Sequence, residues 1–233
     1  MIQLDKVLPI VAIFLPQPLK ILFYRRILGW QIGKGVKIGF SYLESENVSI
    51  DDDANIGHFN VIRNLKSLKI EKNARIANFN QFYGDRRKRA IAGWNRELII
   101  EERVRFMSHH FLDVSGTIKI GSNTTIGGRD THFWSHGRLY NDGIFKLGAI
   151  NIEIGANSYV GARATLIGCK IPDGAIVGAG SIVNKSFEGD DSYAFLIAGN
   201  PAQIKKKYPR TKSPELKQTV RQQQESESES SAT

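Results

Sequence analysis

Residues 154–183 read IGANSYVGARATLIGCKIPDGAIVGAGSIV. Aliphatic side chains recur about every six residues along this stretch, at Ile154, Val160, Leu166, Ile171, Val177 and Val183. Small residues follow four places later at Ser158, Ala164, Ala175 and Ser181. That period is too long for an amphipathic helix and too regular for an ordinary strand. It is typical of a β-helix, in which each repeat adds a short strand whose aliphatic side chain points inward, and Gly or Asn permits the corner.

The same repeat, less regular, organises most of the remaining chain. It can be followed from Ile32 to Phe82 and again from Ile100 onward. Two stretches interrupt it: a basic one at 83–99, with four consecutive basic residues at Arg86–Arg89, and a turn-prone one at 137–151. We therefore expect a β-helix over 31–186 with these two loops leaving it, a C-terminal cap over 187–208, and a disordered tail over 209–233, where apolar residues are almost absent.

The first thirty residues form a separate amphipathic segment. The apolar run 7–15 is too short to span a bilayer, and 19–30 interleaves apolar side chains with Lys20, Arg25 and Arg26. Two interpretations remain open, and they are compatible. The segment packs across the open end of the β-helix as a cap, or it lies on a membrane surface.

The composition indicates the cellular compartment and the classes of partner. One cysteine, Cys169, in 233 residues excludes an intrachain disulfide framework and indicates a reducing compartment, so we expect a cytoplasmic protein, with a peripheral contact at the inner face of the membrane. The formal net charge of +9 would suit a phosphorylated cofactor, a phospholipid surface or a nucleic acid. No nucleic-acid-binding module accompanies this charge, and we expect no nucleic-acid partner.

The repeat at 154–183, followed by Ala-Gly-Asn-Pro-Ala at 198–202 and by Lys205 and Lys206, resembles the hexapeptide-repeat acyltransferases. Maltose and galactoside O-acetyltransferases and polysaccharide O-acetyltransferases show this pattern. The resemblance implies a mainly β fold, a left-handed parallel β-helix with a short N-terminal helical segment and a C-terminal cap. It also implies a homotrimer that uses acetyl-CoA, or another acyl-CoA, as co-substrate without a metal.

The resemblance also assigns residues. A histidine after the Ile-Gly pair at 120–121 acts as catalytic base in that family, and His136 stands at the matching place. A base of this kind suits the reaction, because an acceptor hydroxyl must lose its proton as it attacks a thioester near neutral pH. The pantetheine arm is expected to lie against the backbone near Ala162 and Ala179, and the cofactor phosphates near Lys205 and Lys206. His132 falls in an inward slot of the repeat, and we expect it to be packed in the core.

The acceptor site departs from the galactoside-type pattern. The Asn-Phe-Asn motif that contacts the acceptor sugar there occurs here at 78–80, one coil too early. The matching place reads MSHHFLD at 107–113, so His109, His110 and Asp113 are the candidates to line the acceptor site. The expected activity is transfer of an acyl group, most simply acetyl, to a hydroxyl of a sugar or a cell-envelope glycan precursor.

Two other functions remain open. A γ-class carbonic anhydrase uses the same fold and three histidines on zinc, which His110, His132 and His136 would have to supply across a subunit boundary. The spacing of His132 and His136 is one residue short of that family's pair. A non-catalytic β-helix scaffold is the second alternative, although such a protein would be expected to lose the catalytic histidine or the cofactor turn.

Overall fold

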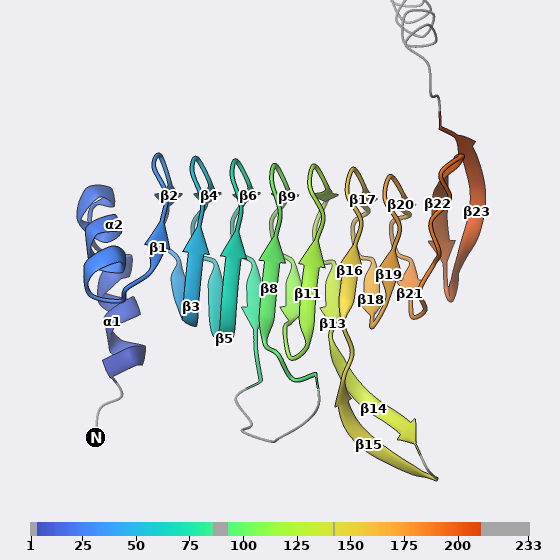
Figure 1. Ribbon diagram of the computed structural model, residues 1–233, viewed down its shortest axis with the longest axis horizontal. Helices are drawn as coiled ribbons and strands as arrows, with labels where there is room; N and C mark the ends of the chain where they lie inside the picture. The colour runs from blue at the N-terminus through green and yellow to red at the C-terminus, as the bar shows by residue number, and fades with distance from the viewer. Residues whose placement is uncertain (1–3, 86–92, 142, 211–233) are drawn as a thin grey trace, which may run out of the picture.

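The computed structural model describes residues 4–85, 93–141 and 143–210, and the side chains from residue 8 onward apart from that of Asn141. Most of this chain winds into a coil of short parallel strands whose axis is horizontal in Figure 1. The near strands run upward and the chain returns behind them while advancing from left to right, so the coil is left-handed. The predicted left-handed parallel β-helix is confirmed.

Each coil has three faces. The first face is formed by β1 (Gln31–Ile32), β3 (Tyr42–Ile50), β5 (Val61–Ile70), β8 (Glu97–Ile100), β11 (Thr117–Ile120), β16 (Ile152–Ile154) and β19 (Lys170–Ile171). The second comprises β2 (Lys37–Ile38), β4 (Asn55–Ile56), β6 (Arg75–Ile76), β9 (Arg105–Phe106), β12 (Thr125–Ile126), β17 (Tyr159–Val160) and β20 (Ile176–Val177). The third comprises the first parts of β3 and β5, then β7 (Gln81–Tyr83), β10 (Phe111–Asp113), β13 (His132–Trp134), β18 (Thr165–Ile167) and β21 (Ile182–Val183).

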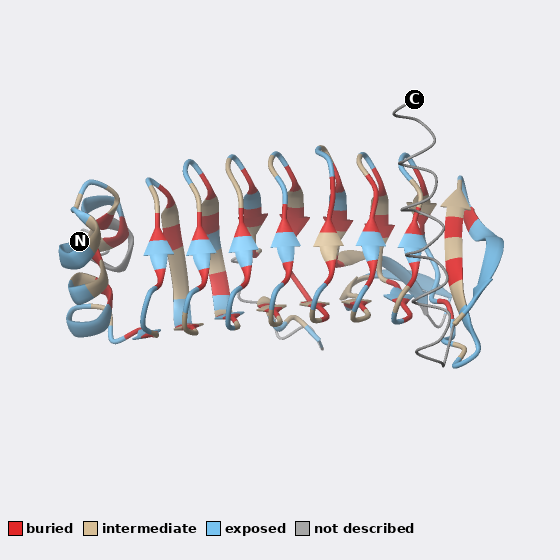
Figure 2. Cartoon of the chain, turned by 90° about the horizontal axis from the view of Figure 1, so that it is seen from above, coloured by how far each residue is buried: buried red, intermediate tan, exposed pale blue. Residues whose placement is uncertain are grey.

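The pairing register explains the six-residue repeat. Aliphatic and Phe side chains stack in columns through the interior, as in the run Ile76, Phe106, Ile126 and Val160 on the second face. The six aliphatic residues of the repeat within 154–183 are 1% exposed or less, and Figure 2 shows buried residues recurring in every coil. Burial of these columns against one another supplies the main stabilisation of the coil.

Other elements cover the two open ends of the coil. At the start, α1 (Leu4–Ile13) packs on β3, and α2 (Gln17–Arg26) packs on β1. At the far end, β22 (Tyr193–Gly199) continues the second face and pairs with the antiparallel β23 (Ala202–Pro209). Both pairs leave the parallel edges of the coil covered, as the edges of soluble β proteins usually are.

Two insertions leave the coil on its lower side in Figure 1. The first joins β7 to β8, and its basic run Arg86–Arg89 lies outside the described residues. The second is the antiparallel hairpin of β14 (His136–Asn141) and β15 (Ile144–Ala149). The predicted tail lies outside the described residues beyond Arg210.

Candidate active site

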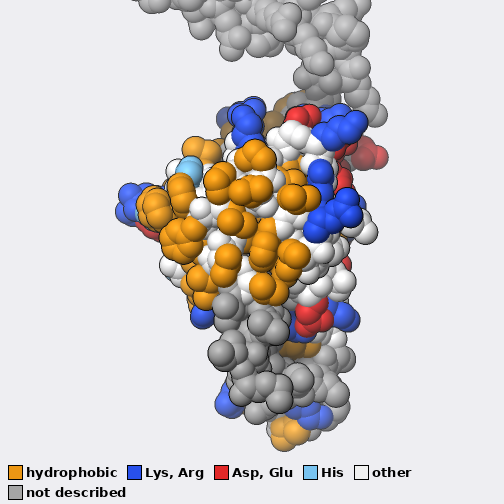
Figure 3. All heavy atoms as spheres, turned by 90° about the vertical axis from the view of Figure 1, so that its left-hand side faces the viewer, with side chains coloured by type: hydrophobic (Ala, Val, Ile, Leu, Met, Phe, Trp, Pro, Cys, Tyr) orange, Lys and Arg blue, Asp and Glu red, His pale blue; other side chains and the backbone are white. Residues whose placement is uncertain are grey.

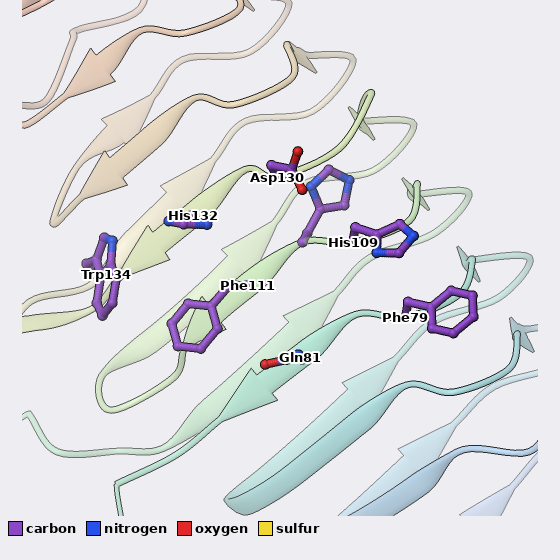
Figure 4. A pocket seen from close by; sticks show the side chains of 8 residues that line it. Phe79, Gln81, His109, Phe111, Asp130, His132 and Trp134 are labelled. Atoms are coloured by element: carbon purple, nitrogen blue, oxygen red, sulfur yellow. The ribbon is translucent and has the colours of Figure 1, made fainter.

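The third face carries an outward cluster of aromatic side chains around a surface pocket. The pocket encloses about 390 Å³ and is lined by Phe79, Gln81, His109, His110, Phe111, Asp130, His132 and Trp134. Figure 4 shows these side chains rising from three successive coils. Phe111 touches both Trp134, at 5.2 Å between ring centroids, and His132, at 5.9 Å. An open pocket with aromatic walls and a few polar groups is typical of a small-ligand site.

The corner beside this pocket is built at a conformational cost. Phe59, Phe79 and His109 have φ angles of 58°, 61° and 66°, a region that bulky residues rarely adopt. The rings of Phe59 and Phe79 stack at 5.1 Å and those of Phe79 and His109 at 5.0 Å. The two phenylalanines are also 59% and 46% exposed, so burial in the chain does not compensate the strain. The same left-handed corner recurs at Asp130 and Arg163 in the next two coils, so it belongs to the turn between the second and third faces and does not single out this pocket.

His110 lies beneath the pocket, inside the coil. It continues a ladder of inward polar residues in which Asn80 Oδ1 accepts the His110 N–H at 2.9 Å and His110 Nδ1 accepts the Thr131 N–H at 3.2 Å. Its side chain is 1% exposed, and this burial lowers its pKa from 6.5 to about 4. The ring is therefore neutral near pH 7 and serves the ladder. This position does not favour the predicted contact of His110 with an acceptor, whereas His109 does line the pocket rim.

His132 was expected inside the core, and the structure contradicts this. Its side chain is exposed and faces the pocket, while Phe133 fills the inward slot. The pairing register gives the reason. Phe106 and Leu112 are six residues apart, but their partners Ile126 and Phe133 are seven apart, so the corner before β13 contains one extra residue. A strict count of six therefore selects the wrong residue.

His136 faces a carboxylate. Its Nδ1 contacts Asp113 Oδ2, and the side chains of the two residues are 26% and 8% exposed. Asp113 is fixed from its other oxygen: Oδ1 accepts the Ser115 N–H at 3.0 Å and the Ser115 hydroxyl at 2.6 Å. The ring of Trp94 lies 5.5 Å from that of His136. The histidine is thus held by a buried, hydrogen-bonded carboxylate and keeps one side open to solvent.

The coil itself brings these two residues together. Asp113 ends β10 opposite Trp134, which ends β13, so His136 follows two residues beyond the partner of Asp113. Ser135 points inward between them and donates its hydroxyl to the Asp113 carbonyl at 2.5 Å. Sequence analysis placed Asp113 with the acceptor and missed its contact with His136. A strict alignment of hexads would also have missed it, because the extra corner residue before β13 shifts the register by one.

The residues predicted to hold the cofactor lie at a different edge. Ala162 and Ala179 sit at the corner that precedes β18 and β21, where Gly180 N donates to Ala162 O at 2.9 Å. Lys205 joins this row, because its side chain lies over the α-carbon of Gly199, whose N–H donates to Ser181 Oγ. Lys206 turns elsewhere and places its Nζ 5.0 Å from the ring centre of Tyr208.

This row and His136 lie at opposite edges of the third face in one chain. Ala162 precedes Thr165, the partner of His132, by three residues, and His136 follows His132 by four. Ala162 and Arg163 form the turn at the corner, and the remaining five steps along the face span roughly 16 Å at about 3.3 Å per residue. One chain therefore does not bring the predicted cofactor row and the predicted base together.

The described residues do not favour the zinc alternative. The His110 ring is inside the coil, His132 points outward, and His136 faces Asp113. Among the residues that the structure describes, no group of three or more His, Cys, Asp or Glu side chains is arranged to hold a metal ion.

Comparison with known proteins gives one sequence relative and several similar structures. A protein of Bacillus subtilis (strain 168) named "Putative acetyltransferase YvoF" is 35% identical over 88 residues, which are 37% of this chain and 46% of that protein. The chain thus matches about half the length of this curated relative. No family model matches the chain.

Two solved acyltransferase structures are similar to this chain at low sequence identity. AntD, an N-acyltransferase from Bacillus cereus solved with a dTDP-sugar and coenzyme A, is 19% identical, with 85% of this chain and 94% of that chain covered and a TM-score of 0.49. A maltose O-acetyltransferase from Clostridium difficile 630 is 17% identical, with 89% and 86% covered and a TM-score of 0.42.

Proposed function

We propose that the protein is an acyl-CoA-dependent O-acyltransferase, with acetyl as the simplest acyl group and a sugar or cell-envelope glycan precursor as acceptor. The contact between His136 Nδ1 and the buried Asp113 carboxylate carries this proposal. A carboxylate at Nδ1 holds the tautomer whose proton is on that nitrogen, which leaves Nε2 free to accept a proton. The sequence similarity to an acetyltransferase agrees with this activity.

In the proposed reaction, His136 Nε2 removes the proton of the acceptor hydroxyl as its oxygen forms a bond to the thioester carbonyl carbon. The imidazolium produced is stabilised by Asp113. A tetrahedral oxyanion results, which a backbone N–H at a coil corner can stabilise. When the C–S bond breaks, His136 returns the proton to the departing sulfur, so that the products are the ester and free coenzyme A.

We assign the acceptor to the pocket on the third face. Its walls offer apolar ring faces from Phe111 and Trp134, and Gln81, Asp130 and His132 supply polar groups at its edges. Apolar walls with a few placed polar groups suit a saccharide, which has C–H faces and a hydroxylated rim. His136 follows Trp134 by two residues on the same outward row, so this pocket leads toward the base.

The site as proposed needs more than one chain. The cofactor row at Ala162, Ala179 and Lys205 is separated from His136 by roughly 16 Å of the third face. In a homotrimer, each third face would meet the corresponding edge of a neighbour, and rotation symmetry would make three equivalent clefts. We therefore propose that acyl-CoA binds between subunits.

We also propose that the enzyme works in the cytoplasm at the inner face of a membrane. The described residues contain no helix long and apolar enough to cross a bilayer. Attachment would therefore be peripheral.

Replacement of the proposed base tests the activity. His136→Ala should lower the turnover of acetyl-CoA with a saccharide acceptor by about a hundred- to ten-thousand-fold. Free thiol release with a panel of nucleotide sugars and lipid-linked sugars measures it, and circular dichroism verifies the fold. His132→Ala, at the pocket wall, is the matched control and should raise KM more than it lowers kcat. Near-normal turnover by His136→Ala at saturating substrates would refute the assignment.

A further inference from the structure

One side of the N-terminal helices α1 and α2 packs against the first coil. Tyr24 is fully buried and stacks on Trp30 at 4.6 Å, and Ala12 is fully buried as well. Lys20 enters the same contact and donates from Nζ to the Ile38 and Gly39 carbonyls at 3.2 and 2.9 Å. These contacts satisfy the edge of the first coil. They also fix the orientation of α2, because rotation of the helix would break them.

The opposite side of the two helices is apolar and uncovered. We call this surface the end platform; its residues are Ile10, Val11, Phe14, Leu19, Leu22 and Ile27, which are 47–74% exposed. Figure 3 looks onto this end of the molecule and shows the hydrophobic side chains gathered in one continuous area. Contiguous apolar surface of this kind on a soluble chain marks a contact with a protein or a membrane.

The charges around the end platform distinguish a protein partner from a membrane surface. Residues 8–43 contain five Lys or Arg and no Asp or Glu, and Asp5, Glu44 and Glu46 flank this range. Arg26, Lys34 and Lys37 are exposed, and Figure 3 shows basic side chains, with fewer acidic ones, at the margins of the apolar area. The carboxylate of Asp52 accepts the Lys34 backbone N–H at 2.6 Å but belongs to the next coil. Two copies meeting end to end would bring these like charges together, whereas an anionic lipid surface complements both the apolar centre and the basic margin.

We propose that the end platform docks the protein on an anionic phospholipid bilayer, with the β-helix axis standing along the membrane normal. This names the surface and the partner for the peripheral location proposed above. Phe14, Leu19 and Leu22 enter the interface between head groups and acyl chains, and Arg26, Lys34 and Lys37 meet the anionic head groups. Rotation about the axis of a cyclic trimer would place three platforms at equal height, which multiplies the attachment.

The upright orientation sets the height of the acceptor pocket. The column Ile38, Ile56, Ile76, Phe106 and Ile126 puts four coil steps between the first coil and the coil of His132. At about 4.8 Å per step the pocket stands roughly 20 Å above the first coil. It therefore receives a sugar that extends away from the bilayer, and lipid head groups lie below its reach.

Vesicle co-sedimentation tests the docking. The full-length protein should sediment with phosphatidylcholine–phosphatidylglycerol vesicles at low salt and much less with phosphatidylcholine alone. The double variant Phe14→Ser/Leu22→Ser should lose about tenfold or more in partitioning. Ile176→Ser/Ile204→Ser, which removes two exposed apolar side chains far from the platform, should bind like the wild type. The variant Arg26→Gln/Lys34→Gln/Lys37→Gln should lose the preference for anionic lipid.

Three results would overturn the inference: wild-type protein that stays in the supernatant, unaltered binding by Phe14→Ser/Leu22→Ser, or a platform-dependent end-to-end dimer without vesicles. Thiol release with a soluble saccharide should be equal in the wild type and both platform variants. Failure of docking with intact transfer would therefore refute the membrane contact alone. Absence of transfer with intact docking would refute the proposed activity alone.

Discussion

Asp113 holds both of its carboxylate oxygens in defined contacts. Oδ1 accepts two hydrogen bonds from Ser115, and Oδ2 faces His136. An asparagine can keep the first contact with its amide oxygen and would then turn its NH₂ toward His136 Nδ1. That donor would favour the tautomer with the proton on Nε2, which cannot act as a base. Asp113 is thus proposed as a positioning residue. Replacement by asparagine removes its negative charge while keeping the size and shape of the side chain.

Asp113→Asn should accordingly lower kcat by about a hundredfold or more with KM and thermal stability nearly unchanged. Steady-state kinetics with varied acetyl-CoA and acceptor give the two constants separately. Asp113→Ala should lower stability as well, since the Ser115 groups lose their acceptor. A variant Asp113→Asn with normal kcat would show that the carboxylate does not orient the base.

His110 should make stability depend on pH. Burial lowers its pKa from 6.5 in the unfolded chain to about 4 in the fold. Between these pH values the unfolded chain binds a proton that the folded chain does not, so stability falls as pH falls from 6.5 to about 4. At 1.36 kcal/mol per pKa unit, the loss is about 3 kcal/mol at most.

Replacement of His110 by Asn tests this, because Asn60 and Asn80 occupy the same inward place on earlier coils. Urea unfolding at several pH values should show a flatter profile for His110→Asn. Thr131→Ala keeps His110 and also keeps the backbone N–H that donates to His110 Nδ1. This control should therefore lower stability but retain the dependence of stability on pH. Equal slopes in wild type and His110→Asn would contradict the assignment.

At the scale of elements, the coil follows from the sequence where the repeat is strict. The repeat residues from Ile154 to Val183, spaced by five or six residues, are all buried, because each fills the same inward place of its strand. Because the corner before β13 contains one extra residue, a strict six-residue count predicts His132, and not Phe133, as the inward residue. The contact of His136 with Asp113 and the Trp94 ring could not be predicted from residue types alone, since it depends on how neighbouring coils align. The exposed end platform likewise depends on which side of α2 the coil buries.

The C-terminal pair β22–β23 offers a matched test of what covers the coil. Ile197 on β22 is fully buried and pairs with Val177, while Ile204 on β23 is 40% exposed. Ile197→Ala should lower the free energy of unfolding by about 2–5 kcal/mol through the cavity that it leaves. Ile204→Ala should change it by less than about 0.5 kcal/mol. Equal effects in urea unfolding would show that β22 does not belong to the core.

At the scale of the whole molecule, the described residues leave three surfaces uncovered in one chain: the end platform, the pocket face and the hairpin β14–β15. The hairpin leaves the body of the coil in Figure 1 and exposes Leu139, Tyr140, Ile144 and Phe145 by 41–67%. It begins at His136, so a neighbour that reaches the base of the hairpin would also lie against the proposed site. A neighbouring subunit would do both, and it would bring a cofactor row to the base.

The proposed homotrimer should therefore be required for activity. Light scattering should give three times the chain mass of 26.1 kDa. Tyr140→Ser/Phe145→Ser removes a ring pair at 5.1 Å that has no core function, so it should yield folded monomers that have lost transfer activity. Tyr208→Ser, which alters an exposed ring at the far end, should leave mass and activity unchanged.

Because each cleft needs two subunits, specific activity of the wild type should also fall on dilution together with the trimer fraction. A monomer with full activity would contradict the shared site, and it would require acyl-CoA to reach His136 along a single chain.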